Sequence, residues 1–141
     1  LLYAYTYDTG NNINAVISMA GPTDLSATDM LDAATKNRMI GFVNWLVDDI
    51  YTQGMPVSTK FKNASPLTYV KSTPTLIIHG SKDSVVLYNQ SVKLDDLLES
   101  KRIPHKLVTI DGANHDLGLA SPRNATRIAQ EVTNWIREYS D

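Results

Sequence analysis

The segment Pro74-Thr-Leu-Ile-Ile-His-Gly-Ser-Lys-Asp-Ser-Val-Val86 decides how the rest of the chain is interpreted. Residues 75–79 form a short run of apolar and β-branched side chains, which predicts a buried strand, and Gly80 ends it. The polar residues that follow, including Asp83, are then expected in a loop at the carboxyl end of the strand. Ligand sites of open parallel sheets form at this edge, so Asp83 is a candidate functional residue.

A second segment repeats this arrangement further along the chain. Residues 106–110 (KLVTI) predict another strand, and the loop Asp111-Gly-Ala-Asn-His-Asp116 follows it. If the two strands are parallel, both loops lie at the same edge of the sheet and Asp83 can meet His115. A carboxylate beside an imidazole fixes its tautomer and stabilises the imidazolium that forms during proton transfer. The pair therefore predicts a general base, His115, oriented by an acid, Asp83.

The remaining elements predict an α/β fold with a small parallel sheet. A buried strand is expected over 13–19, and residues 1–8 look like the middle of a helix. Helices are expected over 88–100 and from Ser121 and Pro122 onward, since Ser is a favoured N-cap and Pro a favoured first helical residue. Residues 25–62 depart from this alternation. One helix is expected there, from the apolar stripe Met39, Phe42, Val43, Leu46, Val47 and Ile50.

Length and composition bound the possible functions. The chain has 141 residues, enough for one compact domain, and a net charge of −2 gives no electrostatic reason to expect a nucleic-acid partner. No apolar run approaches the ~18 residues of a membrane span. The absence of cysteine excludes disulfides and thiol chemistry, and no His, Asp or Glu spacing predicts a metal site. No targeting signal is readable, so the compartment stays undetermined.

The segment "PTLIIHGSKDSVV", followed by a helix, a strand and "GANHDL", resembles the C-terminal part of an α/β-hydrolase of the esterase/lipase type. The resemblance runs from about residue 1 to residue 139. It implies three parallel strands with flanking helices, the triad acid at Asp83 and the triad base at His115. Residues 25–62 lie where the family often places a cap over the site. The family's reaction needs no cofactor, and its substrate is a small-molecule ester.

The resemblance also implies a nucleophile outside these residues. The family carries it on a G-x-S-x-G elbow between a strand and a helix, and no serine here stands in that context. Residues 1–7 correspond to later turns of the helix that starts at the elbow, so the nucleophile is expected a few residues before Leu1. The chain alone is therefore expected to be inactive. The open edge of its first strand is expected to be covered by a missing N-terminal part or by self-association.

Other side chains near these motifs have competing interpretations. Asp116 is a weaker candidate for the acid, because it directly follows His115 and would have to turn back toward its ring. His79 is expected to be structural, beneath the acid loop, and His105 to face solvent. The apolar stripe over 39–50 is expected to pack in the core or cap, with an acyl-binding wall as the alternative.

Three other functions fit the same residues. A peptidase of the prolyl-oligopeptidase type has the same acid and base loops, and a dienelactone-hydrolase-like enzyme would use a cysteine at the elbow. A non-catalytic member would keep the fold for binding alone. Neither the acyl nor the alcohol specificity follows from the sequence, and no substrate-binding residue is predicted.

Overall fold

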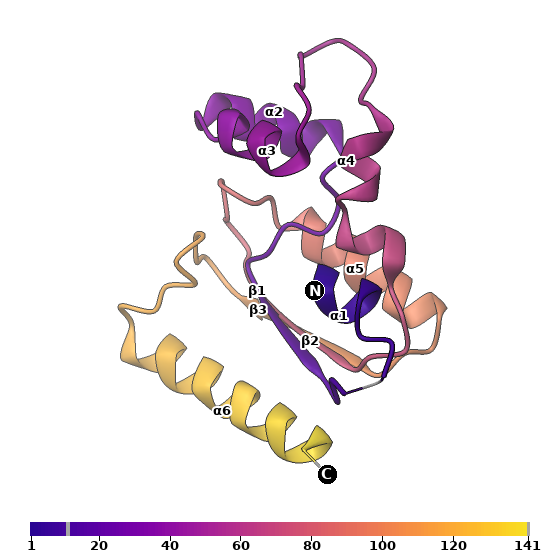
Figure 1. Ribbon diagram of the computed structural model, residues 1–141. Coiled ribbons are helices and arrows are strands. Elements are labelled where there is room, and N and C mark those ends of the chain that lie inside the picture. The colour runs from indigo at the N-terminus through magenta and orange to yellow at the C-terminus, as the bar shows by residue number, and fades with distance from the viewer. Residues whose placement is uncertain (11, 141) are drawn as a thin grey trace.

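The structure, a computed structural model, describes residues 1–10 and 12–140. One parallel sheet has the strand order β1-β2-β3, with β1 at Val16–Met19, β2 at Thr75–Gly80 and β3 at His105–Ile110. The helices are α1 (Leu2–Thr6), α2 (Thr28–Lys36), α3 (Ile40–Val47), α4 (Thr59–Asn63), the 3₁₀ helix η1 (Pro66–Tyr69), α5 (Asn89–Ser100) and α6 (Pro122–Tyr139). The predicted parallel α/β fold is confirmed (Figure 1).

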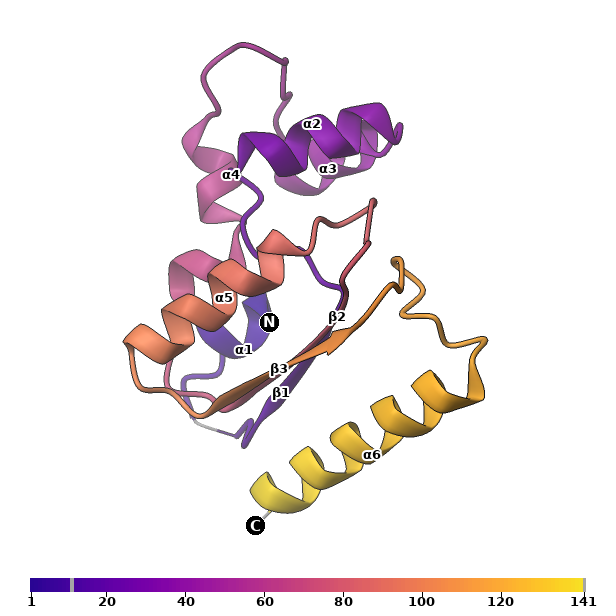
Figure 2. The same ribbon diagram turned by 180° about the vertical axis from the view of Figure 1, so that it is seen from behind.

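Two helical layers cover the two faces of the sheet. Helix α6 lies alone on one face, and α1 and α5 lie on the other (Figure 2). The central strand β2 is buried along its whole length, and its side chains alternate between the two layers. Leu76 and Ile78 pack with Ile128 and Trp135 of α6, whereas Ile77 packs with Leu94 of α5. This period-2 alternation is what a strand between two helical layers requires.

The first strand is shorter than the sequence predicts. It begins at Val16, not at Ile13, because the backbone N–H groups of Asn12 and Ile13 both donate to the Asp8 carboxylate at 2.9 Å. Within the described residues, β1 pairs with β2 and with no other strand. The expectation that another segment or chain covers its free edge stays a prediction.

The alternating tyrosines of the N-terminal segment are explained by helix α1. Tyr5 is fully buried, and its hydroxyl is 2.7 Å from the Thr75 hydroxyl at the start of β2. Tyr3 and Tyr7 lie on the exposed side, with their ring centroids 6.1 Å apart. One tyrosine therefore ties α1 to the sheet and the other two face outward.

Between β1 and β2 the chain forms a helical insertion, α2 to α4, beyond the carboxyl ends of the strands (Figure 1). It has its own apolar cluster, built from Leu25, Met30, Leu31, Ala34, Val43, Val47, Tyr51 and Phe61. The single helix predicted from the apolar stripe is wrong in extent. Helix α3 ends at Val47, since Asp48 adopts a left-handed conformation, and the sequence pattern missed α2 and α4.

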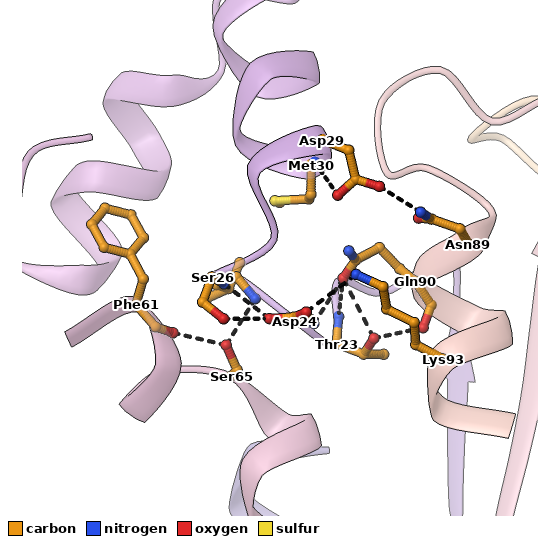
Figure 3. Close-up of polar contacts among 11 residues, drawn as sticks. Thr23, Asp24, Ser26, Asp29, Met30, Phe61, Ser65, Asn89, Gln90 and Lys93 are labelled. Carbon is orange, nitrogen blue, oxygen red and sulfur yellow. Dashed lines mark hydrogen bonds and ion pairs between the residues drawn. The ribbon is translucent and has the colours of Figure 1, made fainter. Parts of the chain in front are cut away.

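The insertion is fastened to α5 by a buried amide (Figure 3). The Gln90 side-chain oxygen accepts hydrogen bonds from the backbone N–H groups of Thr23 at 3.1 Å and Asp24 at 2.7 Å. The Thr23 hydroxyl donates to the Gln90 backbone carbonyl at 2.6 Å. Thr23 and Gln90 are both fully buried, so these bonds replace contacts with water that the groups cannot make.

Two further groups fix the same junction. The Ser65 hydroxyl accepts from the Leu25 N–H and donates to the Phe61 carbonyl, both at 2.8 Å. The Asp24 carboxylate accepts from Ser26 and lies 3.3 Å from the Lys93 ammonium. Burial raises the pKa of Asp24, but the Ser26 and Lys93 hydrogen bonds and the Lys93 charge outweigh it and lower that pKa below its ordinary value. The carboxylate therefore keeps its charge and its Lys93 pair at neutral pH.

Close packing at Gly80 brings the loops after β2 and β3 together. A Cβ at residue 80 would collide with the backbone carbonyl oxygens of Ala113 and Asn114. The Lys82 N–H donates to the Ala113 carbonyl at 2.9 Å, and the Ser84 N–H donates to the Asn114 side-chain oxygen at 3.0 Å. The two loops therefore form one unit at the carboxyl edge of the sheet.

The Gln90→Ala variant should lose roughly 1–3 kcal/mol of unfolding free energy, because the buried N–H of Thr23 and that of Asp24 lose their acceptor. Urea denaturation followed by circular dichroism measures this loss. Gln130→Ala, at an exposed position on α6, is the matched control and should change stability by less than about 0.5 kcal/mol. Equal stability of the two variants would contradict the anchoring role.

The Gly80→Ala variant should lose about 1–3 kcal/mol, because the new methyl group forces the two loops apart. Gly41→Ala carries the same substitution in helix α3, where a Cβ meets no atom within 4 Å, and should gain up to about 1 kcal/mol. Thermal unfolding of both proteins gives the comparison. A Gly80→Ala protein as stable as the wild type would show that the loops are not packed against this residue.

Candidate active site

The Asp83 carboxylate is buried and accepts four hydrogen bonds. Its Oδ1 accepts from the backbone N–H groups of Val85 at 2.9 Å and Val86 at 3.0 Å, so the loop folds back on its own side chain. Its Oδ2 lies 3.0 Å from His79 Nε2 and 2.8 Å from His115 Nδ1. An ionised carboxylate has about four acceptor positions, and all of them are used here. Protein groups therefore occupy all acceptor positions of the Asp83 carboxylate and fix it in position.

The loop after β3 brings His115 to this carboxylate. The carboxylate can only accept, so His115 Nδ1 carries the proton and the ring's other nitrogen, Nε2, is the basic one. Within the described residues, Asp83 is the one hydrogen-bond partner of His115. The imidazole is 45% exposed, whereas the Asp83 side chain is 0% exposed. The arrangement leaves a basic nitrogen free to take a proton at the surface of the site.

His79, the last residue before Gly80, supports the same carboxylate from below. Its Nε2 lies 2.9 Å from the Val86 carbonyl, which can only accept, so Nε2 is the protonated nitrogen. It donates to Asp83 as well, and its Nδ1 accepts from the Ser91 hydroxyl at 2.6 Å. His79 is fully buried, in agreement with the structural role expected for it. It also links α5 to the Asp83–His115 pair, which the sequence did not indicate.

The two other side chains considered from the sequence lie apart from the pair. The Asp116 carboxylate accepts from the Gly118 N–H at 2.9 Å and has no hydrogen bond to His115. The expectation that His105 faces solvent is wrong, because its side chain is only 13% exposed. Its Nδ1 donates to the Ile103 carbonyl at 2.7 Å, and its Nε2 is 3.5 Å from Asp95. His105 thus closes the turn between α5 and β3.

A pocket of about 260 Å³ opens beside His115, between the end of β1 and the helical insertion. Of its lining, the sequence named His115 as the candidate base and gave the apolar stripe over 39–50 an acyl-binding wall only as the alternative to core or cap packing. Three exposed residues of the stripe, Met39, Phe42 and Leu46, line the pocket. The lining residues are Met19, Ala20, Pro22, Leu25, Met30, Ala34, Met39, Phe42, Val43, Leu46, Val85, Val86 and His115.

A larger hollow of about 380 Å³ lies elsewhere, between the loop before β1 and the end of α6. It borders Ile17 and Trp135 and is far from the Asp83–His115 pair, since it lies at the amino ends of the strands. Across the described ranges, 1–10 and 12–140, no group of three or more His, Cys, Asp or Glu side chains could hold a metal ion. Within those same ranges no helix combines the length and the apolar character needed to cross a bilayer.

Comparison with known proteins identifies relatives of this architecture. Dipeptidyl-peptidase 5 of Schizosaccharomyces pombe is 30% identical over 82 residues, which cover 57% of this chain and 12% of that protein. A truncated form of a carbohydrate esterase from gut microbiota superposes with a TM-score of 0.62 at 23% identity, covering 86% of this chain and 42% of the other. The acylaminoacyl peptidase of Pyrococcus horikoshii superposes with a TM-score of 0.72 at 18% identity, covering 96% of this chain and 21% of the other.

The two superposed structures share the fold, and all three proteins are longer than this chain. The matched residues span 12% of the length of the S. pombe peptidase, and the superposed residues span less than half of either solved structure. The model of the BD-FAE family matches residues 2–98, more than half of the chain. This chain therefore belongs to the BD-FAE family, a family of α/β-hydrolases of the esterase/lipase type.

Proposed function

We propose that the full-length protein is a serine hydrolase that cleaves carboxylic esters, with His115 as its general base and Asp83 as the acid that orients it. The observation that carries this proposal is the 2.8 Å hydrogen bond between Asp83 Oδ2 and His115 Nδ1 at the edge of a pocket. It leaves His115 Nε2 as the basic nitrogen, which is the tautomer that a Ser-His-Asp mechanism requires.

The reaction would proceed in two halves. A serine oxygen attacks the ester carbonyl carbon while His115 Nε2 takes the hydroxyl proton; the C–O bond to the alcohol then breaks, and the imidazolium returns the proton to the leaving oxygen. Water attacks the resulting acyl-enzyme in the same way and releases the acid. Asp83 keeps its negative charge throughout and stabilises the imidazolium.

The nucleophile of this mechanism belongs to residues outside the chain described here. The resemblance to the esterase/lipase hydrolases implies a serine on an elbow preceding Leu1 in the full-length polypeptide, together with the groups that bind the oxyanion. The greater length of the relatives is consistent with this proposal. The free edge of β1 would then pair with a strand from that preceding part, and the chain alone would be inactive.

The helical insertion is proposed to act as the cap of the site. Helices α2 and α3 contribute one wall of the pocket beside His115, and the anchor at Gln90 holds the insertion over the carboxyl ends of the strands. A cap in this place excludes water from the reacting groups, which strengthens the electrostatic interactions there. The insertion and the sheet would therefore form one functional domain together with the upstream residues.

A peptidase is the second candidate, because named relatives are a dipeptidyl-peptidase and an acylaminoacyl peptidase. The same base and acid would serve amide cleavage. A dipeptidyl-peptidase must also hold a charged amino terminus, for which a carboxylate at the pocket is the expected partner. Within the described part of the chain, no carboxylate lines the pocket. The apolar lining therefore argues against a charged amino terminus in this pocket, but it does not separate an ester from an amide whose amino terminus is acylated.

Asp83→Asn and His115→Ala in the full-length protein should each lower kcat/KM for 4-nitrophenyl butyrate by about 10²–10⁴-fold, the usual worth of a positioned general base. The Asp83→Asn amide can donate to the imidazole and so favours the wrong tautomer. Asp116→Asn is the matched control for the carboxylate change. Its amide oxygen can still accept from the Gly118 N–H, so its kcat/KM should stay within about threefold of wild type.

Two results would contradict the proposal. Equal effects of Asp83→Asn and Asp116→Asn would show that the Asp83–His115 hydrogen bond has no role in catalysis. A wild-type protein that hydrolyses peptide amides but no activated ester would favour the peptidase. A wild-type protein inactive on both substrate classes would favour a non-catalytic member that uses the fold for binding.

A further inference from the structure

The pocket beside His115 has an unusually uniform lining. Twelve of its thirteen lining residues are apolar, and His115 supplies the one titratable side chain among those that the described ranges place there. A sugar or a charged group in this space would lose its hydrogen bonds to water and find few replacements, which is costly. A hydrocarbon group has no hydrogen bonds to water to lose, and its burial removes apolar surface from water. The lining therefore matches a hydrocarbon group.

The walls of the pocket differ in exposure. Its floor is buried, since Leu25, Met30 and Val43 belong to the apolar cluster of the insertion. Its rim is open, because Phe42 and Leu46 of α3 are 57% and 53% exposed. Exposed apolar side chains on one helix face normally mark a surface that binds something. Here that face continues directly into the pocket.

The size of the pocket limits what can enter. Its volume of about 260 Å³ lies just below the ~300 Å³ at which pockets for drug-sized ligands begin. At roughly 30 Å³ for each water-sized group, about eight such groups fit. The space that the described residues enclose therefore accommodates one half of an ester and not both halves.

The position of His115 indicates which part of the ester, acyl or alcohol, occupies the pocket. Its imidazole lines the pocket and is 45% exposed. The leaving alcohol must receive a proton from this ring and depart, and water must then reach the same ring to release the acid. The solvent-exposed part of the ring serves both steps. The apolar pocket suits the acyl group, which stays bound until water releases it.

We propose that this pocket is an acyl subsite for aliphatic chains of about four to eight carbons, and that Phe42 and Leu46 of the cap select them. This inference rests on the proposed function and adds its substrate class. Each methylene that enters an apolar pocket should raise kcat/KM roughly fourfold. Methionines 19, 30 and 39 on the wall adapt to different chain shapes, so the preference should be broad within this range.

The test measures kcat/KM of the full-length protein for 4-nitrophenyl esters of acetate, butyrate, hexanoate, octanoate and dodecanoate. The value should rise by at least tenfold from acetate to hexanoate and stop rising beyond octanoate, where the pocket is full. A second series, acetate esters of ethanol, butanol and hexanol, should vary by less than about threefold. The two series separate an acyl subsite from an alcohol subsite.

Two variants with the same type of substitution test whether Leu46 selects the acyl chain. Leu46→Gln places an amide of similar size on the pocket wall and should reduce the hexanoate-to-acetate ratio by about fivefold or more. Ile50→Gln makes the corresponding change at a residue that is 77% exposed and does not line the pocket, so the ratio should be unchanged. Because both variants are at exposed positions, folding is expected to be preserved in each.

The outcomes distinguish this inference from the function on which it rests. A protein that hydrolyses acetate as well as hexanoate, or that responds to the alcohol series and not the acyl series, contradicts the acyl subsite and leaves the esterase intact. Equal ratios in Leu46→Gln and Ile50→Gln also contradict it. A protein that hydrolyses no ester of any length contradicts the proposed function, and the subsite with it.

Discussion

The parallel pairing of β2 with β3 is the constraint on which the rest of the site depends. Their register sets Gly80 beside Ile110, so both strands deliver their loops to one edge of the sheet. Because residue 80 lacks a side chain, the second loop can pack directly on the first. The distance from Asp83 to His115 follows from this backbone contact, and the buried His79 then fixes the carboxylate from beneath. The candidate base and acid are thus placed by the sheet.

The helical insertion gives this rigid pair its surroundings. Its apolar cluster is separate from the two clusters that cover the sheet, and it is fastened to α5 by buried hydrogen bonds to Gln90. The same insertion lines the pocket together with His115. Chemistry and selection would therefore belong to different parts of the chain. Changes on the exposed face of α3 could alter the accepted acyl group without disturbing the Asp83–His115 hydrogen bond.

The sequence predicted most of the sheet layer and little of the insertion. Strands and α6 were readable because each has an uninterrupted periodic pattern bounded by Gly, Pro or a Ser at the N-cap position, although the Ser121 side chain makes no capping hydrogen bond. Asp83 and His115 were readable because each follows a strand in a motif. The start of β1 was missed because the Asp8 side chain takes the N–H of Ile13, a tertiary contact that no local pattern reports. The sequence left the stripe over residues 39–50 between core packing and a binding wall, because its residues divide between the two only when α3 is placed in three dimensions.

An intact-mass spectrum of the full-length protein, recorded before and after treatment with a fluorophosphonate, shows whether His115 and Asp83 serve a serine nucleophile. We expect one covalent adduct, mapped by peptide sequencing to a serine that precedes Leu1, and slow or absent labelling in a His115→Ala variant. No adduct on a folded wild-type protein, or an adduct that forms equally fast without the imidazole of His115, would rule out a serine hydrolase that uses this pair.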